Sequence, residues 1–229
     1  MSTIAENVGA VRARMAEAAK RAGRDPAAVL LVAVSKTKGA AEVLAAEAAG
    51  CRDFGENYAQ ELVEKATALE ALAPGGERRW HFIGQLQRNK MRAIAGKVSL
   101  FHGVDRASLA DEIGMRCAAL GVRADVLVQV NVAGEAQKGG CEPAALGELL
   151  AHIERSPSLR LRGLMTMPPA DSAEEARPWF RALRELRDRH GATERLPELS
   201  MGMSHDFEIA IEEGATLVRV GSAIFGERR

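Results

Sequence analysis

Short apolar runs alternate with amphipathic segments along most of this chain. The runs are too short for buried helices, whereas apolar residues in the segments between them recur every three or four positions. This alternation predicts strands at 29–38, 51–55, 80–84, 98–104, 124–132, 159–165, 198–201 and 217–221. It predicts helices at 40–49, 59–72, 90–95, 108–120, 173–190 and 207–213, and another helix that begins near Pro143.

An additional amphipathic helix is expected before the first strand. Ile4, Val8, Val11 and Met15 recur at helical spacing, and Gly23 ends the segment. The apolar stripe of this helix needs a surface to pack against, which the strand–helix units that follow can provide.

About eight strand–helix units follow one another without a linker or a change in composition. This pattern predicts an α/β fold, a (β/α)8 TIM barrel with an extra N-terminal helix, as a single domain over residues 1–229. The alternative is an open doubly wound sheet, which usually carries a glycine-rich fingerprint after its first strand. No G-x-G-x-x-G motif follows Lys36, so the barrel is favoured.

Composition and charge exclude several functional classes. Hydrophobic residues make up 47% of the 229 positions and charged residues 27%, which is ordinary for a globular protein. The 31 basic and 31 acidic residues cancel, so no overall field attracts nucleic acid or an acidic membrane. No apolar run is long enough to span a membrane, and the N-terminus lacks a signal-peptide pattern. The three cysteines are widely spaced, which predicts reduced thiols and no metal site in a soluble cytoplasmic protein.

Lys36 stands near the end of the first apolar run and is the main candidate for chemistry. Burial of an ammonium group beside an apolar core lowers its pKa, and the neutral amine is the form that attacks carbonyl carbons. Such a lysine forms Schiff bases. A lysine that ends a strand and extends its amine into water is the alternative, and this stretch alone leaves both open. Lys38 and Lys138 are expected to be solvated.

Arg219 is expected to face the interior of the barrel. In the strand at 217–221, Val218 and Val220 suit the apolar layer under the helices, so alternation points Arg219 inward, close to the rim. An inward arginine needs a partner. The sequence leaves open an internal salt bridge, a ligand's ring nitrogen and a bound anion.

Two turns rich in glycine and serine follow the seventh and eighth predicted strands. The first runs from Ser200 to Asp206, and the second contains Gly221 and Ser222 before a short helix. In TIM barrels these two loops often bind phosphate through backbone N–H groups, so an anion site is predicted there. Asn57 and His81 end the second and third strand units and are also expected at the rim.

Seven motifs occur in an order that resembles the pyridoxal phosphate homeostasis protein family over nearly the whole chain. They are AVSK at 33–36, FGENY at 54–58, HFIG at 81–84, GLM at 163–165, LSMGMS at 199–204, VRVG at 218–221 and IFG at 224–226. The resemblance implies a barrel like the N-terminal domain of alanine racemase, with pyridoxal 5′-phosphate (PLP) held as a Schiff base on Lys36. Gln85 and His205 depart from residues frequent in the family.

The resemblance also implies roles for the other candidate residues. Arg219 would face the pyridine nitrogen of PLP. Ser204, Gly221 and Ser222 would hold the phosphate, and Asn57, His81 and Met201 would line the cofactor pocket.

Three functions from different classes are compatible with these features. The resemblance implies a monomeric PLP carrier or regulator without evident catalysis, whose transient partners would be PLP-dependent apo-enzymes. A PLP-dependent amino-acid racemase would need a second acid or base opposite the lysine, and the only tyrosine is Tyr58. A Schiff-base lyase acting on a phosphorylated sugar usually places its lysine late in the barrel, and here Lys36 comes early.

Overall fold

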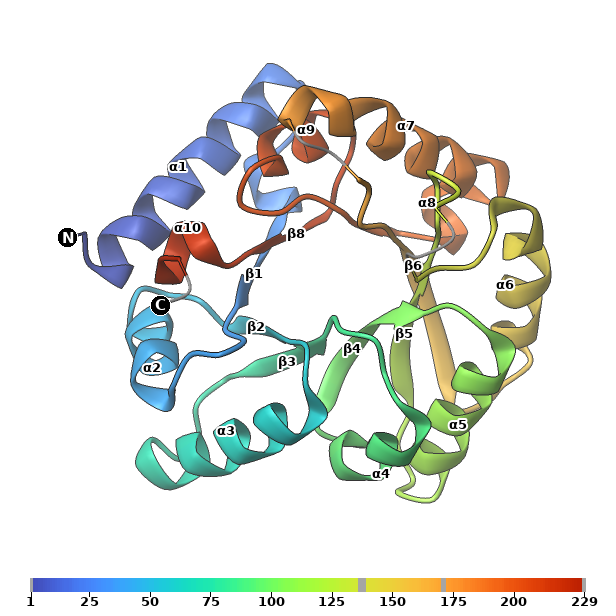
Figure 1. Ribbon diagram of the computed structural model, residues 1–229, viewed down its shortest axis with the longest axis horizontal. Helices are drawn as coiled ribbons and strands as arrows, with labels where there is room; N and C mark the ends of the chain where they lie inside the picture. The colour runs from blue at the N-terminus through green and yellow to red at the C-terminus, as the bar shows by residue number, and fades with distance from the viewer. Residues whose placement is uncertain (1, 136–138, 170–171, 228–229) are drawn as a thin grey trace.

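The computed structural model describes residues 2–135, 139–169 and 172–227. In this part of the chain, parallel strands follow one another in sequence order around a closed barrel (Figure 1). The strands are β1 (Leu30–Val34), β2 (Asp53–Glu56), β3 (Arg79–Phe82), β4 (Val98–Val104), β5 (Ala124–Gln129), β6 (Leu159–Met165), β7 (Glu198–Ser200) and β8 (Leu217–Val220).

Helices surround the strands on the outside of the barrel (Figure 1). They are α1 (Ile4–Arg21), α2 (Ala40–Ala48), α3 (Ala59–Leu72), α4 (Met91–Ile94), α5 (Ala107–Ala118), α6 (Leu146–Glu154), α7 (Ala173–Arg189), α8 (Ala192–Arg195), α9 (Phe207–Glu212) and α10 (Ser222–Phe225), with 3-10 turns at Pro26–Ala28, Arg88–Lys90 and Pro143–Ala145.

The predicted (β/α)8 barrel with an extra N-terminal helix is confirmed. β8 pairs in parallel with β1, with Val32 opposite Arg219, so the sheet closes and the open doubly wound alternative is wrong. α1 begins with a capping box in which Thr3 and Glu6 bond each other's backbone amides. This helix packs beside α10, and Asn7 Nδ2 donates to the carbonyl oxygen of Ile224 at 2.9 Å.

Apart from the first strand, which was predicted to continue to residue 38 and ends at Val34, two elements differ from the prediction. The strand predicted at 124–132 ends at Gln129, because the next residues bond a loop: Val130 bridges Cys141, and the Asn131 amide donates to the Cys141 carbonyl. Helix α8 was not predicted, since it is only one turn long and follows α7 after Gly191. Neither difference changes the order of the strands.

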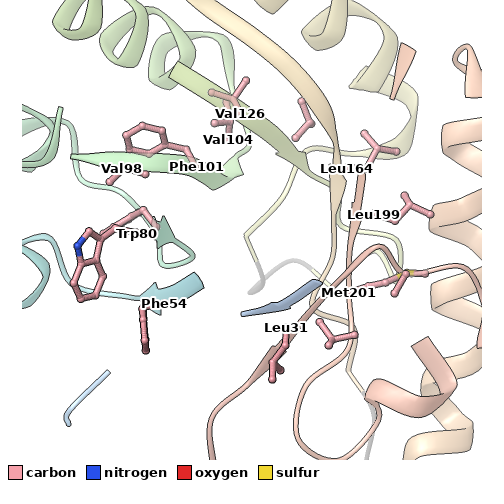
Figure 2. Close-up of a cluster of buried hydrophobic side chains, with 14 of the residues drawn as sticks. Leu31, Phe54, Trp80, Val98, Phe101, Val104, Val126, Leu164, Leu199 and Met201 are labelled. Atoms are coloured by element: carbon pink, nitrogen blue, oxygen red, sulfur yellow. The ribbon is translucent and has the colours of Figure 1, made fainter. Parts of the chain in front are cut away.

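Alternation along the strands separates two apolar layers. The larger layer lies between the strands and the helices, and Figure 2 shows part of it, with residues from β1 to β7. A smaller cluster fills the barrel interior and consists of Val32, Leu100, Leu127, Met165 and Leu217. Val218 and Val220 belong to the outer layer. Arg219, which stands between them in the sequence, is buried on the opposite face of the strand, as the alternation predicts.

The sequence predicted neither a membrane span nor a metal site. In the part of the chain that the structure describes, no helix combines the length and the apolar composition that crossing a bilayer requires. The same residues contain no group of three or more His, Cys, Asp or Glu side chains placed to hold a metal ion. Cys51, Cys117 and Cys141 are buried free thiols.

Candidate functional site

A cavity of about 390 Å³ opens at the carboxyl ends of the strands. Six of the eight candidate residues line it: Lys36, Asn57, Ser204, Arg219, Gly221 and Ser222. They come from the segments that follow β1, β2 and β7 and from β8 and its following turn, so the closed barrel brings the two ends of the sequence to one rim. Loops at this end of a TIM barrel carry the functional groups in characterised enzymes of the fold.

The loop that carries Lys36 is fixed by buried charges beneath it. Lys65 on α3 donates to the Ser35 carbonyl at 2.7 Å and to Glu56 Oε1 at 2.6 Å. The Ser35 hydroxyl donates to the same Glu56 oxygen at 2.6 Å. On the other side of Lys36, the Thr37 amide donates to Glu61, and Thr37 adopts a left-handed φ of 63°. Hydrogen bonds therefore hold the backbone on both sides of Lys36.

Glu56 is a buried carboxylate whose two oxygens differ in their hydrogen bonding. Its Oε2 is buried without a hydrogen bond among the described residues. Burial raises the pKa of Glu56, although the bonds from Lys65 and Ser35 oppose this shift. Removing this carboxylate from water costs free energy, and its ion pair with Lys65 offsets part of that cost.

Asn57 follows Glu56 in the sequence and lines the cavity. Its Oδ1 is buried and has no hydrogen-bond partner among the described residues. The Asn57 backbone lies against Gly84, where an added Cβ would stand 2.2 Å from the Asn57 carbonyl oxygen. Gly84 is therefore required for this approach.

The two predicted turns meet at one side of the cavity. Ser204 Oγ accepts hydrogen bonds from the amides of Gly221 at 3.2 Å and Ala223 at 3.3 Å. The first turn needs glycine at 202, where φ is 91° and an added Cβ would lie 2.9 Å from the Phe207 Cα. These contacts hold Ser204, Gly221 and Ser222 together, as the sequence predicted for neighbouring turns.

Arg219 is buried and has neutral partners among the described residues. Its Nη1 donates to Ser200 Oγ at 2.6 Å, and its Nη2 donates to the Thr166 carbonyl at 2.9 Å. Burial lowers the pKa of Arg219 to about 10, while the carboxylate of Asp206 acts in the opposite direction. At neutral pH the guanidinium is still a cation. Of the three partners that the sequence left open, the structure shows no internal salt bridge in the described part of the chain.

His81 and Met201 are not among the residues that line the cavity. His81 lies in the barrel interior, bonded to Asp53 and His102, one layer beneath Ile83. Met201 is fully buried in the outer layer, because Ser200 before it faces inward and alternation turns Met201 toward the helices. Their direct contact with a cofactor stays a prediction.

Lys38 differs from its prediction as a solvated side chain. It is half-buried, lines the cavity and donates from Nζ to the Phe225 carbonyl at 3.1 Å. Lys138, predicted with it, lies outside the described residues.

Several cavity residues were missed by reasoning from the sequence. Val34 and Ile83 line the cavity, and each shares its face with a predicted residue two positions away, Lys36 and His81. Extending the alternation by one step would have found both. Phe225 and Met203 come from turns whose conformation no periodic pattern reveals.

The fold places the chain in a known class of barrels. The family model described as "Alanine racemase, N-terminal domain" matches residues 7–229. An alanine racemase from Corynebacterium glutamicum shares the fold with a TM-score of 0.65 at 17% identity, over 96% of this chain and 61% of that chain.

Closer relatives narrow the class. The pyridoxal phosphate homeostasis protein of Pseudomonas aeruginosa is 50% identical over 100% of this chain and 97% of its own. That of Aquifex aeolicus is 46% identical over 98% of both chains. A structure of PipY from Synechococcus elongatus PCC7942 with PLP bound has a TM-score of 0.82 and 34% identity, over 98% of this chain and 100% of that chain. The chain therefore belongs to the pyridoxal phosphate homeostasis protein family.

Proposed function

We propose that this protein binds PLP in the cavity at the carboxyl ends of the strands and acts in PLP homeostasis by storing, delivering or regulating the cofactor. The observation that carries the proposal is that Lys36, Arg219 and the two turns that contain Ser204 and Ser222 line one cavity. Relatives at 46% and 50% identity are named for PLP homeostasis, and PipY is 34% identical and holds PLP.

The cavity matches the chemical groups of PLP. The cofactor supplies an aldehyde carbon, a pyridine nitrogen and a phosphate. Lys36 offers an amine for the aldehyde, and Arg219 offers charged N–H donors for the ring nitrogen. The hydroxyl groups of Ser204 and Ser222 and the Gly221 turn suit the phosphate. Asn57, whose Oδ1 has no hydrogen-bond partner in the described part of the chain, gives the site one more polar side chain. The whole chain, residues 1–229, would serve as a single PLP-binding domain.

Lys36 is proposed as the residue that holds PLP covalently. Its amine would attack the aldehyde carbon and form a C=N bond, with the aldehyde oxygen leaving as water. This Schiff base is reversible by hydrolysis, which suits a protein that gives the cofactor up again. PLP-dependent apo-enzymes are the proposed transient recipients.

A carrier role is favoured over racemisation by the position of Tyr58. Racemisation requires a second acid or base opposite the lysine. Tyr58 is the only tyrosine in the sequence, its side chain is 59% exposed, and it does not line the Lys36 cavity. We therefore propose a non-catalytic role, and a screen for turnover of amino acids by the PLP-loaded protein tests it. A monomer is also proposed, and light scattering on the purified protein tests that state.

The deciding experiment is a titration of the purified protein with PLP. A saturable imine absorbance is expected, and borohydride reduction followed by peptide mass spectrometry should locate the label on Lys36. Label spread over surface lysines, or no saturable absorbance, would refute the proposal. Transfer to an apo-enzyme can then be followed by the recovery of that enzyme's activity.

A further inference from the structure

A row of polar side chains crosses the barrel interior beneath the cavity. Arg219 Nη1 lies 2.6 Å from Ser200 Oγ, and His102 Nδ1 lies 2.8 Å from the same oxygen. His102 Nε2 is 2.9 Å from His81 Nδ1, and His81 Nε2 is 3.0 Å from Asp53 Oδ1. All five residues are buried, with His102 and Ser200 fully so. Such a row inside an apolar barrel is costly unless every member is satisfied.

The two ends of the row determine the direction of its hydrogen bonds. Arginine can only donate, and an ionised carboxylate can only accept. Asp53 is the accepting end: burial alone would raise its pKa, but bonds from Arg79 and His81 hold the pKa below its ordinary value. The direction therefore runs from Arg219 to Asp53.

One arrangement of protons gives every donor in the row an acceptor. Ser200 accepts from Arg219 and donates its own proton to His102 Nδ1. His102 then donates from Nε2 to His81 Nδ1, and His81 donates from Nε2 to Asp53. A doubly protonated His81 would reverse the middle bond and leave the Ser200 proton without an acceptor among the described residues. In this arrangement each ring carries one proton, on Nε2.

The environment of His102 agrees with this assignment. Its side chain is fully buried, and burial together with the neighbouring His81 and Arg219 lowers the pKa of His102 well below its ordinary value. A neutral ring is the form that donates from one nitrogen and accepts at the other.

We propose that Ser200, His102 and His81 are positioning residues that fix the guanidinium of Arg219 toward the cavity, with Asp53 as the balancing anion at the other end of the row. The part of this inference that concerns the ligand rests on the proposed PLP function. Ser200 and the Thr166 carbonyl take one N–H from each terminal nitrogen of Arg219. These two bonds fix the plane of the guanidinium, and among the residues that the structure describes its other N–H groups have no hydrogen-bond partner.

The far end of the row opens at the opposite side of the barrel. Asp53 accepts from Arg79 Nε at 2.7 Å and Nη2 at 2.6 Å, and the Arg79 side chain is 54% exposed. Both residues line a second cavity of about 430 Å³ at the amino ends of the strands. A substitution at Asp53 should therefore alter the position of the Arg219 guanidinium, although Asp53 does not line the cavity that contains Lys36.

The first test needs no ligand. Nitrogen-15 NMR of the histidine rings in the PLP-free protein at pH 7 should show both His81 and His102 as neutral Nε2–H tautomers. A proton on Nδ1 of either ring, or a doubly protonated ring, would overturn the assignment. This result decides the direction of the row even if the protein takes up no PLP, in which case the proposed function would fail separately.

The second test compares two aspartates that form the same kind of pair. Asp53→Asn removes the anion of the row, whereas Asp125→Asn removes an anion on β5 that bonds Arg160 on β6 at 2.7 and 2.8 Å. Asp53→Asn should weaken PLP binding about threefold to tenfold and alter the absorbance of bound PLP, because a hydrogen-bonded charge is lost. Asp125→Asn should change neither.

Variants of Ser200 complete the test. Ser200→Ala should reproduce the effect of Asp53→Asn on affinity and absorbance, and Ser200→Thr, which keeps the hydroxyl, should restore both toward the wild type. Equal behaviour of Asp53→Asn and Asp125→Asn, or an unaltered spectrum in Ser200→Ala, would show that the row does not position Arg219.

Discussion

Lys65 Nζ lies 2.7 Å from the backbone carbonyl oxygen of Ser35, the residue directly before Lys36. The same ammonium group lies 2.9 Å from Glu61 Oε1, which accepts the amide of Thr37 directly after Lys36. A buried lysine on α3 thus fixes the backbone on both sides of the lysine that lines the cavity. The backbone position of Lys36 therefore depends on Lys65, which does not line the cavity.

Replacing Lys65 by methionine should destabilise the protein strongly. The change leaves Glu56, which is fully buried, without its counter-ion. Loss of one partner of a buried ion pair costs about 3–5 kcal/mol. Urea unfolding measures this loss, and the double variant Lys65→Met/Glu56→Gln should recover much of it. Lys20→Met, which breaks an exposed pair with Glu17, is the control and should leave the midpoint unchanged. Equal midpoints for Lys65→Met and Lys20→Met would contradict the assigned role.

Lys36→Ala should abolish imine formation and keep the fold. The side chain is at the cavity wall, so its truncation leaves the buried Lys65–Glu56 pair in place. Absorbance during PLP titration and circular dichroism measure the two properties. Lys38→Ala is the matched control, because it truncates another lysine that lines the same cavity. An undiminished imine absorbance in Lys36→Ala would show that another amine holds PLP.

Ser222→Asp should weaken PLP binding by about tenfold or more, because it places a negative charge beside the predicted phosphate position. Pyridoxal, which lacks the phosphate, should bind the variant and the wild type with similar affinity. Ser222→Asn has nearly the same shape without the charge and is the control. If PLP affinity is the same in all three proteins, the phosphate lies elsewhere.

Arg219→Glu should change the absorbance of bound PLP. A carboxylate beside the pyridine nitrogen favours the protonated ring, whereas the guanidinium disfavours it. The variant also loses the bonds to Ser200 and Thr166, so its thermal unfolding must be measured before the spectra are compared. A folded variant with an unaltered spectrum and affinity would mean that Arg219 does not contact the ring.

Stability should fall as the pH drops below about 6.5, in part because of His102. The pKa of His102 in the folded protein is well below 6.5, so between those two values the unfolded chain binds the proton and the folded protein does not. One such group contributes a slope of up to about 1.4 kcal/mol per pH unit. Urea unfolding from pH 7.5 to 5 measures the slope.

His102→Gln isolates this contribution. Burial raises the pKa of Glu56 and of Asp206, and groups of this kind gain stability as the pH falls, but both are present in either protein. The difference in slope between the wild type and His102→Gln therefore reports His102. An identical slope in the two proteins would argue against a neutral, buried ring at this position.

The barrel could be predicted from sequence because its strands are short and apolar and its helices carry a stripe. Val218 and Val220 belong to the outer layer, so their inward neighbour Arg219 followed from alternation alone. The meeting of the two turns was predicted for a similar reason, since glycine and serine follow two strands whose ends meet in a barrel.

The polar interior could not be predicted in the same way. Ser200, His102 and His81 lie on β7, β4 and β3, and their contacts depend on strand register across the barrel, which no local pattern specifies. Lys65 was equally hidden: with Glu61 four residues before it, the pair resembles an exposed helix salt bridge, yet the lysine is buried.

The closure of β1 against β8 has a consequence for how the protein is made. Lys36 emerges early in synthesis, whereas Arg219, Gly221 and Ser222 belong to the last segment that the structure describes. At about 5–20 residues per second, roughly 10 to 40 seconds separate the two ends of the site during translation. A similar time separates Asn7 from Ile224 on α10, whose carbonyl oxygen accepts a hydrogen bond from the Asn7 side chain. During translation the Lys36 amine therefore emerges long before the residues of β8 and its following turn that complete the cavity wall.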